Sequence, residues 1–304
     1  MKAALSLDLD NKWSYMKTHG DAGWQSFPSY LDVLIPDALS VLRTFGVHIT
    51  FFVVGQDAAL DYNREALGQL SAAGHEVGNH SYHHEPWMHR RSRQELNDEL
   101  ARSEESIAEA TGCVPRGFRG PGFVRSPLLA DVLAARGYLY DASSLPTFIG
   151  PLARAYYFRS AKLAQREREE RYDLYGHFAD GFGRNRRHRI QAGDGTLEEV
   201  PVTTMPGLRL PIHVSYVLYI ATVSPRLALA YFRAALLLCK ATRTEPSILL
   251  HPLDFLSLHD CPELAFFPAM SMDAATKRTV LFGTMRMLVD MFEVMPLERF
   301  ISRS

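Results

Sequence analysis

Short apolar runs alternate with longer segments of helical period along this chain of 304 residues, and this alternation constrains the fold more than any other feature. Residues 3–9, 48–54 and 76–79 have the pattern of strands, and a helix is expected between each pair, ending at Gly46 and at Gly74. This βαβα order is typical of a parallel sheet or barrel covered by helices. The first eighty residues therefore predict an α/β protein.

The same rhythm continues downstream with clear helix boundaries. Ser92 and Glu95 form a capping box for a helix that ends near residue 110, and Pro127 opens a second helix that stops at Gly137. Further strands are expected at residues 138–140 and 247–250, and further helices at 224–241 and 273–292. Because no internal repeat divides the chain, we expect one domain over residues 1–304.

A basic stretch interrupts the pattern at about residues 145–195. Between Arg154 and Arg189, nine arginines and Lys162 stand against five acidic residues, which gives a local charge of +5. We expect this stretch to be an inserted, partly helical lid over the scaffold. It is either a solvated surface or a binding surface for phosphate or anionic lipid, because a charge run alone does not separate the two.

Composition limits which binding partners and which cellular compartment we expect. Lys and Arg (33) balance Asp and Glu (34), so the net charge of -1 offers no global field for nucleic acid. The three widely spaced cysteines predict neither a disulfide framework nor a CxxC zinc site and fit a reducing compartment. Asp8 interrupts the N-terminus before an apolar run of signal length, so we expect a cytoplasmic protein, with the inner face of the membrane as a further location.

One apolar stretch, residues 212–239, resembles a membrane span in composition. Pro225, Arg226 and Arg233 interrupt it, so it predicts a buried strand or loop followed by a core helix. An interfacial helix that touches a membrane is the alternative.

Two carboxylates and two imidazoles form a candidate metal site. Asp8 and Asp10 close the first expected strand, where alternation places both on one side, although a solvated turn is the alternative. His80 and His84 are four residues apart after the third expected strand, so one helical turn would align their imidazoles, although a polar loop is the alternative. Two imidazoles and a carboxylate would hold a cation and leave positions open for water and substrate.

Further segments extend this pattern in a fixed order. They are residues 49–55, residues 74–84 (Gly-His-Glu-Val-Gly-Asn-His-Ser-Tyr-His-His), residues 119–123 (Arg-Gly-Pro-Gly-Phe), residues 138–141 (Tyr-Leu-Tyr-Asp) and residues 248–251 (Ile-Leu-Leu-His). Together with the aspartates of the first strand, they are similar to the motifs of the polysaccharide deacetylase (NodB-like, carbohydrate esterase family 4) superfamily.

The resemblance implies a distorted (β/α) barrel whose functional groups gather at the C-terminal ends of the strands. It implies that Asp10, His80 and His84 bind one divalent metal ion, with zinc as the first candidate and cobalt, nickel, iron or manganese as alternatives. It also implies that Asp8 is the general base and that His251 is the general acid.

The same resemblance implies roles for residues around these groups. Arg119 and Asp141 would orient and tune the base and the acid, although a purely structural ion pair between them is the alternative. We expect the substrate to contact residues in the motif loops, namely Trp13, Tyr82, Trp87, Pro121 and Gly122.

Two departures from the family pattern affect these assignments. The family usually has two adjacent aspartates followed by Gly, whereas here Leu9 separates the aspartates and Asn11 follows them, so Asp8 and Asp10 can exchange roles. In addition, Glu85 stands where the family commonly has the proline that follows the second histidine.

These expectations define a metal-dependent hydrolase that removes an N-acetyl or N-formyl group from an amino sugar. The expected substrate is an N-acylated sugar or glycolipid inside the cell, with peripheral membrane contact and no nucleic acid; the oligomeric state is unknown. Three other readings remain: a metal-independent cyclic-amide hydrolase of the same fold, a non-catalytic glycan-binding module, and a non-haem iron oxygenase, which uses the same ligand set.

Overall fold

The computed structural model describes residues 1–163, 165–170 and 176–302. Its strands are β1 (Lys2–Asp8), β2 (Thr50–Val53), β3 (Glu76–Asn79), β4 (Gly117–Phe118), β5 (Tyr140–Asp141), β6 (His188–Ala192), β7 (Gly195–Glu199), β8 (Ser247–Leu250) and β9 (Glu293–Met295). Among the described residues they form one sheet in the order β6-β7-β5-β4-β3-β2-β1-β8, with β9 paired to β1. The strands pair in parallel, apart from the antiparallel hairpin of β6 and β7.

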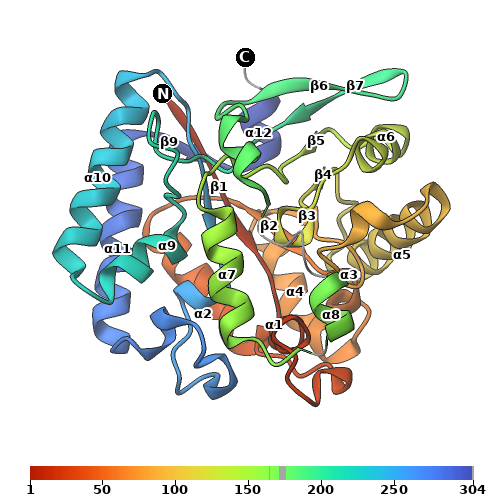
Figure 1. Cartoon of the computed structure of the whole chain (residues 1–304), viewed down its shortest axis with the longest axis horizontal. Coiled ribbons are helices and arrows are strands. Elements are labelled where there is room, and N and C mark those ends of the chain that lie inside the picture. The colour runs from red at the N-terminus through yellow and green to blue at the C-terminus, as the bar shows by residue number, and fades with distance from the viewer. Residues whose placement is uncertain (164, 171–175, 303–304) are drawn as a thin grey trace.

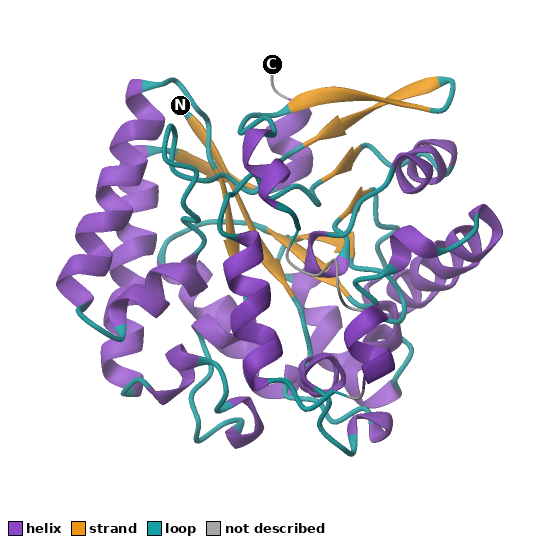
Figure 2. Ribbon diagram, in the orientation of Figure 1, coloured by secondary structure: helices purple, strands orange, loops and turns teal. Residues whose placement is uncertain are grey.

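Helices surround this curled half-barrel sheet (Figures 1 and 2). They are α1 (Lys12–His19), α2 (Leu31–Thr44), α3 (Gly55–Ala58), α4 (Asp61–Ala72), α5 (Arg93–Thr111), α6 (Pro127–Ala135), α7 (Gly150–Ser160), α8 (Gln165–Glu170), α9 (Val214–Ala221), α10 (Pro225–Ala241), α11 (Ala274–Met291) and α12 (Leu297–Ser302). The sequence prediction of an α/β protein with a distorted, barrel-like parallel sheet is confirmed.

Both faces of β1 are buried, as expected for a parallel strand covered on both sides. Leu5 and Leu7 belong to the large outer core that β1 and β2 share with α2, α4, α9, α10 and α11. Ala4 faces the other side, where it packs in a smaller core that includes Phe52, Leu297 and Phe300. The C-terminal helix α12 therefore fills the interior of the half-barrel.

The predicted boundaries hold best where a capping residue marks them. Ser92 caps α5 through a reciprocal capping box with Glu95, and Gly112 ends that helix in the left-handed conformation. Ser126 and Pro127 open α6 as expected. Strand β4 was not predicted, because two residues are too short to show a period, and β5 begins two residues later than expected.

The basic stretch is only partly an insertion over the scaffold. Its first part contains α7 and α8, and the end of α7 lies against α1, where the Lys162 N–H donates to the carbonyl of His19 at 2.8 Å. Its last part is the β6–β7 hairpin, which joins the sheet because β7 pairs with β5, so that part is not a lid. Arg171 and Asp173 lie outside the described residues.

The apolar stretch at residues 212–239 forms two helices, α9 and α10. The expected strand or loop at its start is therefore wrong, since Val214–Ala221 is helical, while the core helix that follows Ser224 is confirmed. None of the described helices combines the length and the apolarity that crossing a membrane requires.

Candidate active site

The first strand leads into two buried carboxylates. Asp8 is the last residue of β1, and Asp10 follows two residues later; they are 4% and 9% exposed. Leu7 and Leu9 lie in the outer hydrophobic core. Because side chains alternate along an extended chain, this burial pattern agrees with the prediction that both carboxylates lie on the side away from that core.

The loop after β3 carries His80 and His84, and it is not helical. Ser81 and His84 have φ angles of 63° and 51°, so the predicted helical turn is wrong. The reason is that the backbone groups of the loop find partners outside it. The N–H groups of Tyr82 and His83 donate to the Glu99 carboxylate of α5 at 3.0 and 2.8 Å.

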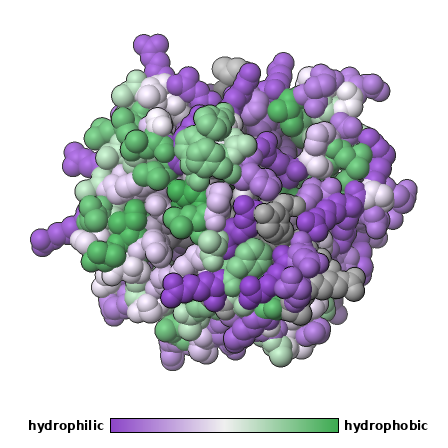
Figure 3. All heavy atoms as spheres, viewed as in Figure 1, coloured by the Kyte–Doolittle hydropathy of each residue, from purple (hydrophilic) through white to green (hydrophobic). Residues whose placement is uncertain are grey.

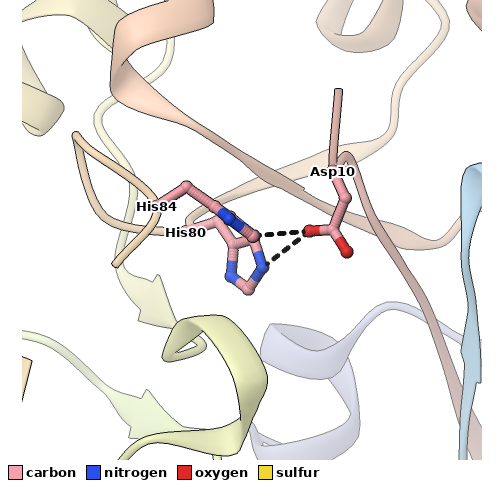
Figure 4. Close-up of side chains that lie close together, drawn as sticks. All are labelled: Asp10, His80 and His84. Atoms are coloured by element: carbon pink, nitrogen blue, oxygen red, sulfur yellow. Dashed lines mark hydrogen bonds and ion pairs between the residues drawn. The ribbon is translucent and has the colours of Figure 1, made fainter. Parts of the chain in front are cut away.

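The imidazoles nevertheless converge on Asp10 (Figure 4). Oδ1 of Asp10 lies 3.1 Å from Nε2 of His80 and 2.8 Å from Nε2 of His84. The three side chains are buried, and their potential ligand atoms lie within 4.8 Å of one another. The predicted convergence of this triad is therefore confirmed, and its role as a set of metal ligands stays a prediction.

The surroundings prepare both imidazoles for a cation. Nδ1 of His80 is 2.6 Å from the carbonyl oxygen of Arg119, which can only accept, so Nδ1 carries a proton and Nε2 is the ring nitrogen available to a cation. Burial lowers the pKa of His84, which favours the neutral ligand form.

The pKa shifts of His80 and Asp10 also favour a cation at this cluster. Burial opposes the charged form of His80, yet the charge of Asp8 and the bond to Asp10 raise the pKa of His80. Burial would raise the pKa of Asp10, but the charge of His84 and bonds from both imidazoles hold it well below its usual value. Positive charge is therefore stabilised beside Asp10, and a divalent cation bound to one carboxylate and two imidazoles fits that requirement.

Asp8 is held by a fully buried arginine. Nη1 of Arg119 donates to Oδ1 of Asp8 at 2.8 Å and to Oγ of Ser6 at 2.8 Å, and Nε donates to the carbonyl of Ala142 at 2.9 Å. Nη2 of Arg119 is buried without a hydrogen-bond partner among the described residues. The guanidinium therefore fixes the position of the Asp8 carboxylate, and its Nη2 remains available as a hydrogen-bond donor.

His251 follows β8 and is oriented by Ser215, a residue that the sequence did not assign to it, while Asp254, for which the sequence left orientation of His251 or a turn cap open, bonds to Ser215. Oγ of Ser215 lies 2.9 Å from Nδ1 of His251 and donates to Oδ1 of Asp254 at 2.7 Å. Because the Ser215 hydroxyl donates its proton to Asp254, its oxygen accepts from Nδ1–H of His251. The other ring nitrogen of His251, Nε2, is therefore the one available for proton transfer. Oδ2 of Asp254 also accepts from the His251 backbone N–H at 2.9 Å, which caps the turn.

Comparison with known proteins finds polysaccharide deacetylases among the similar proteins. Residues 21–140 match the family model described as polysaccharide deacetylase. That segment is about two fifths of the chain, and its match supports the resemblance of the motifs to the polysaccharide deacetylase superfamily. A solved structure from Mycobacterium smegmatis named for this family superposes with a TM-score of 0.64 at 20% identity and covers 99% of this chain and 88% of that chain. At that identity the superposition shows a shared fold.

Sequence relatives match shorter regions. A peptidoglycan deacetylase from Helicobacter pylori is 31% identical over 128 residues, which are 42% of this chain and 41% of that protein. A chitooligosaccharide deacetylase from a Bradyrhizobium species is 37% identical over 87 residues, or 28% of this chain and 38% of that protein. The chain thus spans about two fifths of the length of these two relatives.

Asp141 does not occupy the place that the polysaccharide deacetylase resemblance implied. Its carboxylate accepts from the Ser143 backbone N–H at 3.1 Å and from the Ser143 hydroxyl, and burial raises its pKa to about 6. Its neighbour across the strands is Glu199 of β7. Among the described residues no hydrogen bond joins it to Arg119 or to His251, so neither direct orientation of His251 nor an ion pair with Arg119 is supported.

Both departures from the deacetylase motifs have local structural reasons. The side chain of Asn11 accepts from the Lys12 N–H at 2.8 Å, which caps α1, and donates to Oδ1 of buried Asp57 at 2.7 Å. Glu85, the additional residue before the proline, lies 3.2 Å from the Lys17 ammonium and pairs with Arg91. Each substitution anchors a loop of the candidate metal site.

The expected substrate contacts are only partly available. Trp13 and Tyr82 are 1% and 2% exposed, which contradicts their interpretation as walls for a sugar. Trp13 instead donates from Nε1 to Asp57 at 2.8 Å. Trp87 is partly exposed, with the Lys17 ammonium 5.9 Å from its ring.

Pro121 is buried, whereas Gly122 lines a pocket of about 680 Å³ that also contains Asp141 and Glu199. This pocket borders the loop that follows Arg119.

Two tyrosines were not assigned to the site from the sequence. The Tyr30 hydroxyl donates to the backbone carbonyl of Asp10 and so fixes the loop after β1. The Tyr15 hydroxyl is buried without a partner among the described residues, and burial together with the charge of Asp10 raises its pKa well above the usual value. No local signal marks Ser6, Ser215 or Tyr30, because each acts on a residue distant in sequence.

Proposed function

We propose that this chain is a metal-dependent hydrolase that removes an N-acyl group from an amino sugar. The observation that carries the proposal is the convergence of Asp10, His80 and His84 beside an Asp8 carboxylate fixed by Arg119. Two of the relatives are named peptidoglycan deacetylase and chitooligosaccharide deacetylase. These names describe the removal of acetyl groups from glycans, which supports an amino-sugar substrate.

A divalent ion held by the triad would polarise the acyl carbonyl and acidify a water molecule. Asp8 then accepts the proton of the attacking water, because Arg119 holds its carboxylate in one orientation. His251 delivers a proton from Nε2 to the departing amine, while Ser215 keeps Nδ1–H in place. The products are a free carboxylic acid and an amino sugar.

The setting of the reaction is part of the proposal. We propose an intracellular N-acetyl or N-formyl sugar as the substrate, free or carried on a lipid phosphate. Exposed apolar side chains at the α9–α10 turn support contact with a membrane surface: Tyr219, Val223 and Leu227 are 50%, 83% and 56% exposed. Figure 3 shows the largest apolar area on the left, the side of α9 and α10, and a mostly polar surface with smaller apolar patches on the right.

The decisive test measures the release of acetate and formate from a panel of N-acylated amino sugars, free and lipid-linked, with zinc-loaded protein. We expect release from at least one substrate, and loss of that release in His80→Ala and in Asp8→Asn. His83→Gln is the matched control, because His83 lies in the same loop but bonds to Glu99. Equal release by the wild type and both site variants would contradict the proposal.

A further inference from the structure

Part of the basic stretch gathers around a second pocket. Arg184, Arg186 and Arg187, which precede β6, line a pocket of about 490 Å³ together with Arg209 from the following loop. None of the residues that line it is an aspartate or a glutamate. Four arginines therefore line one pocket that has no acidic lining residue.

Two of these arginines have structural partners. Arg186 donates to the carbonyl of Thr242 at the end of α10 and, at 3.1 Å, to the hydroxyl of Thr244. Arg187 pairs with Glu198 at 2.9 Å, and Glu198 also pairs with Arg189 at 2.8 Å. Both partners of Arg186 are uncharged, and the single negative charge of Glu198 is shared between Arg187 and Arg189. These contacts therefore leave a net positive charge at the pocket.

The other two arginines have no such explanation. Neither Arg184 nor Arg209 forms an ion pair or a side-chain hydrogen bond with a described residue, and Nη1 of Arg209 is buried without a partner. Arg209 also has a φ of 58°, and its backbone is fixed by a bond to Met205 and by the Thr147 hydroxyl. A buried guanidinium N–H without an acceptor destabilises the fold, so an anion from solution would supply what the chain lacks.

On its Thr242–Thr244 side the pocket reaches the start of β8, whereas the triad of Asp10, His80 and His84 lies beyond the C-terminal end of β1. Thr244 lies three residues before β8, and the neighbouring Glu245 accepts from the Lys2 N–H at the start of β1. Asp10 follows the other end of β1, which at about 3.3 Å per residue spans about 20 Å. Figure 1 shows the N-terminus and the β6–β7 hairpin at the top and the region of α1 at the bottom. Arg184 and His188 also line the larger pocket beside Gly122, so the two pockets adjoin at these residues, whereas Arg186 and Arg209 line the smaller pocket alone.

We propose that this pocket is a binding site for a phosphate group. Arg184, Arg186 and Arg209 would share its oxygens through charge-assisted hydrogen bonds, which arginine forms with phosphate in planar, two-point geometry. The phosphate belongs either to a membrane lipid headgroup or to a soluble phosphate ester. Leu208, next to Arg209, is 61% exposed and would enter the lipid in the first case.

The test compares the phosphate affinity of the wild type, Arg184→Ala, Arg209→Gln and Arg189→Ala by calorimetry and thermal unfolding at low ionic strength. The exposed Arg189, on the same hairpin but outside the pocket, is the matched control. We expect inorganic phosphate to raise the melting temperature of the wild type and of Arg189→Ala by a few degrees. Arg184→Ala and Arg209→Gln should bind phosphate about tenfold more weakly.

Two further arms identify the source of the phosphate. Co-sedimentation with vesicles that contain phosphatidylglycerol, lost in Arg184→Ala and kept in Arg189→Ala, assigns the site to a lipid headgroup. Binding of a sugar phosphate without vesicle binding assigns it to a soluble ester. No response to phosphate in the wild type, or an equal response in Arg184→Ala and Arg189→Ala, would overturn the proposal. Arg184 is exposed, so its variant remains informative even if Arg209→Gln does not fold.

Discussion

The β1–β3 half of the candidate site and its β8 half are held in place in different ways. In the first half, Asp8 is fixed by Arg119 and His80 by the carbonyl of that same arginine, so the deacetylase motifs support one another. In the second half, His251 is held by Ser215 of α9, a helix that carries none of the motifs. The comparison teaches that the triad half is held together by residues of the deacetylase-like motifs, whereas the His251 half depends on a residue outside those motifs.

Asp8→Asn gives the largest expected effect, and it tests the first half. The amide still accepts a bond from Arg119 but cannot take a proton from water, so kcat should fall about a thousandfold while metal content stays at the wild-type value. Steady-state kinetics and metal analysis on the same preparation measure both. Loss of the metal in this variant would show instead that Asp8 and Asp10 exchange roles.

Glu99→Gln tests how the loop of the metal half is held. Burial would raise the pKa of Glu99, but its bonds with His83 and the charge of Arg91 lower it to about 2. The pKa of Glu99 is about 2 in the folded chain and near 4.5 in the unfolded chain, so ionised Glu99 stabilises the fold above about pH 4.5. That contribution disappears as the pH falls toward 2. We therefore expect the variant to lose about 3 kcal/mol of unfolding free energy at pH 7 and nearly none at pH 2.

Urea unfolding at a series of pH values measures this difference. Glu109→Gln is the control, because Glu109 lies on the same helix and its side chain is 56% exposed. A pH-independent difference between Glu99→Gln and the wild type would contradict the assignment.

Ser215→Ala tests the second half. Without the hydroxyl, the His251 imidazole loses the acceptor for Nδ1–H, so kcat should fall about tenfold at unchanged KM. Ser215→Thr keeps a hydroxyl and should recover most of the rate. A rise in KM with unchanged kcat would show that Ser215 acts on substrate binding and not on the position of His251.

Tyr15→Phe gives the smallest expected effect and asks whether the two halves share a donor. The raised pKa keeps the Tyr15 hydroxyl protonated near Asp10, where it can donate to water or to an acyl oxygen. We expect kcat to fall about threefold, as for one neutral hydrogen bond. Tyr62→Phe, at a residue that is 58% exposed, should retain the wild-type rate.

The sequence predicted the fold well wherever a strand or a helix carried its own signal. The capping box of Ser92 fixed the start of α5, and alternation at Leu7 and Leu9 located the buried carboxylates. The helix α9 was missed because a short, continuous apolar run fits a buried strand equally well. The β6–β7 hairpin was missed because its charged edge lacks an apolar period.

Within the site, the residues in motifs were predictable and their partners were not. The spacing of His80 and His84 suggested a helical turn, whereas the Glu99 carboxylate imposes a loop with positive φ angles. Ser215 lies 36 residues before His251, and only the packing of α9 against β8 brings them together. Asp141 turns toward Ser143 because the segment that follows β5 offers that partner two residues away.

Calorimetric titration of chelator-treated protein with Zn²⁺ tests the central claim most directly. The wild type and His83→Gln should each bind one equivalent, and His80→Ala should bind more than a hundredfold more weakly because it loses a direct ligand. Zinc binding by His80→Ala with the affinity of the wild type, or no binding by the wild type, would contradict the claim that Asp10, His80 and His84 hold a catalytic cation.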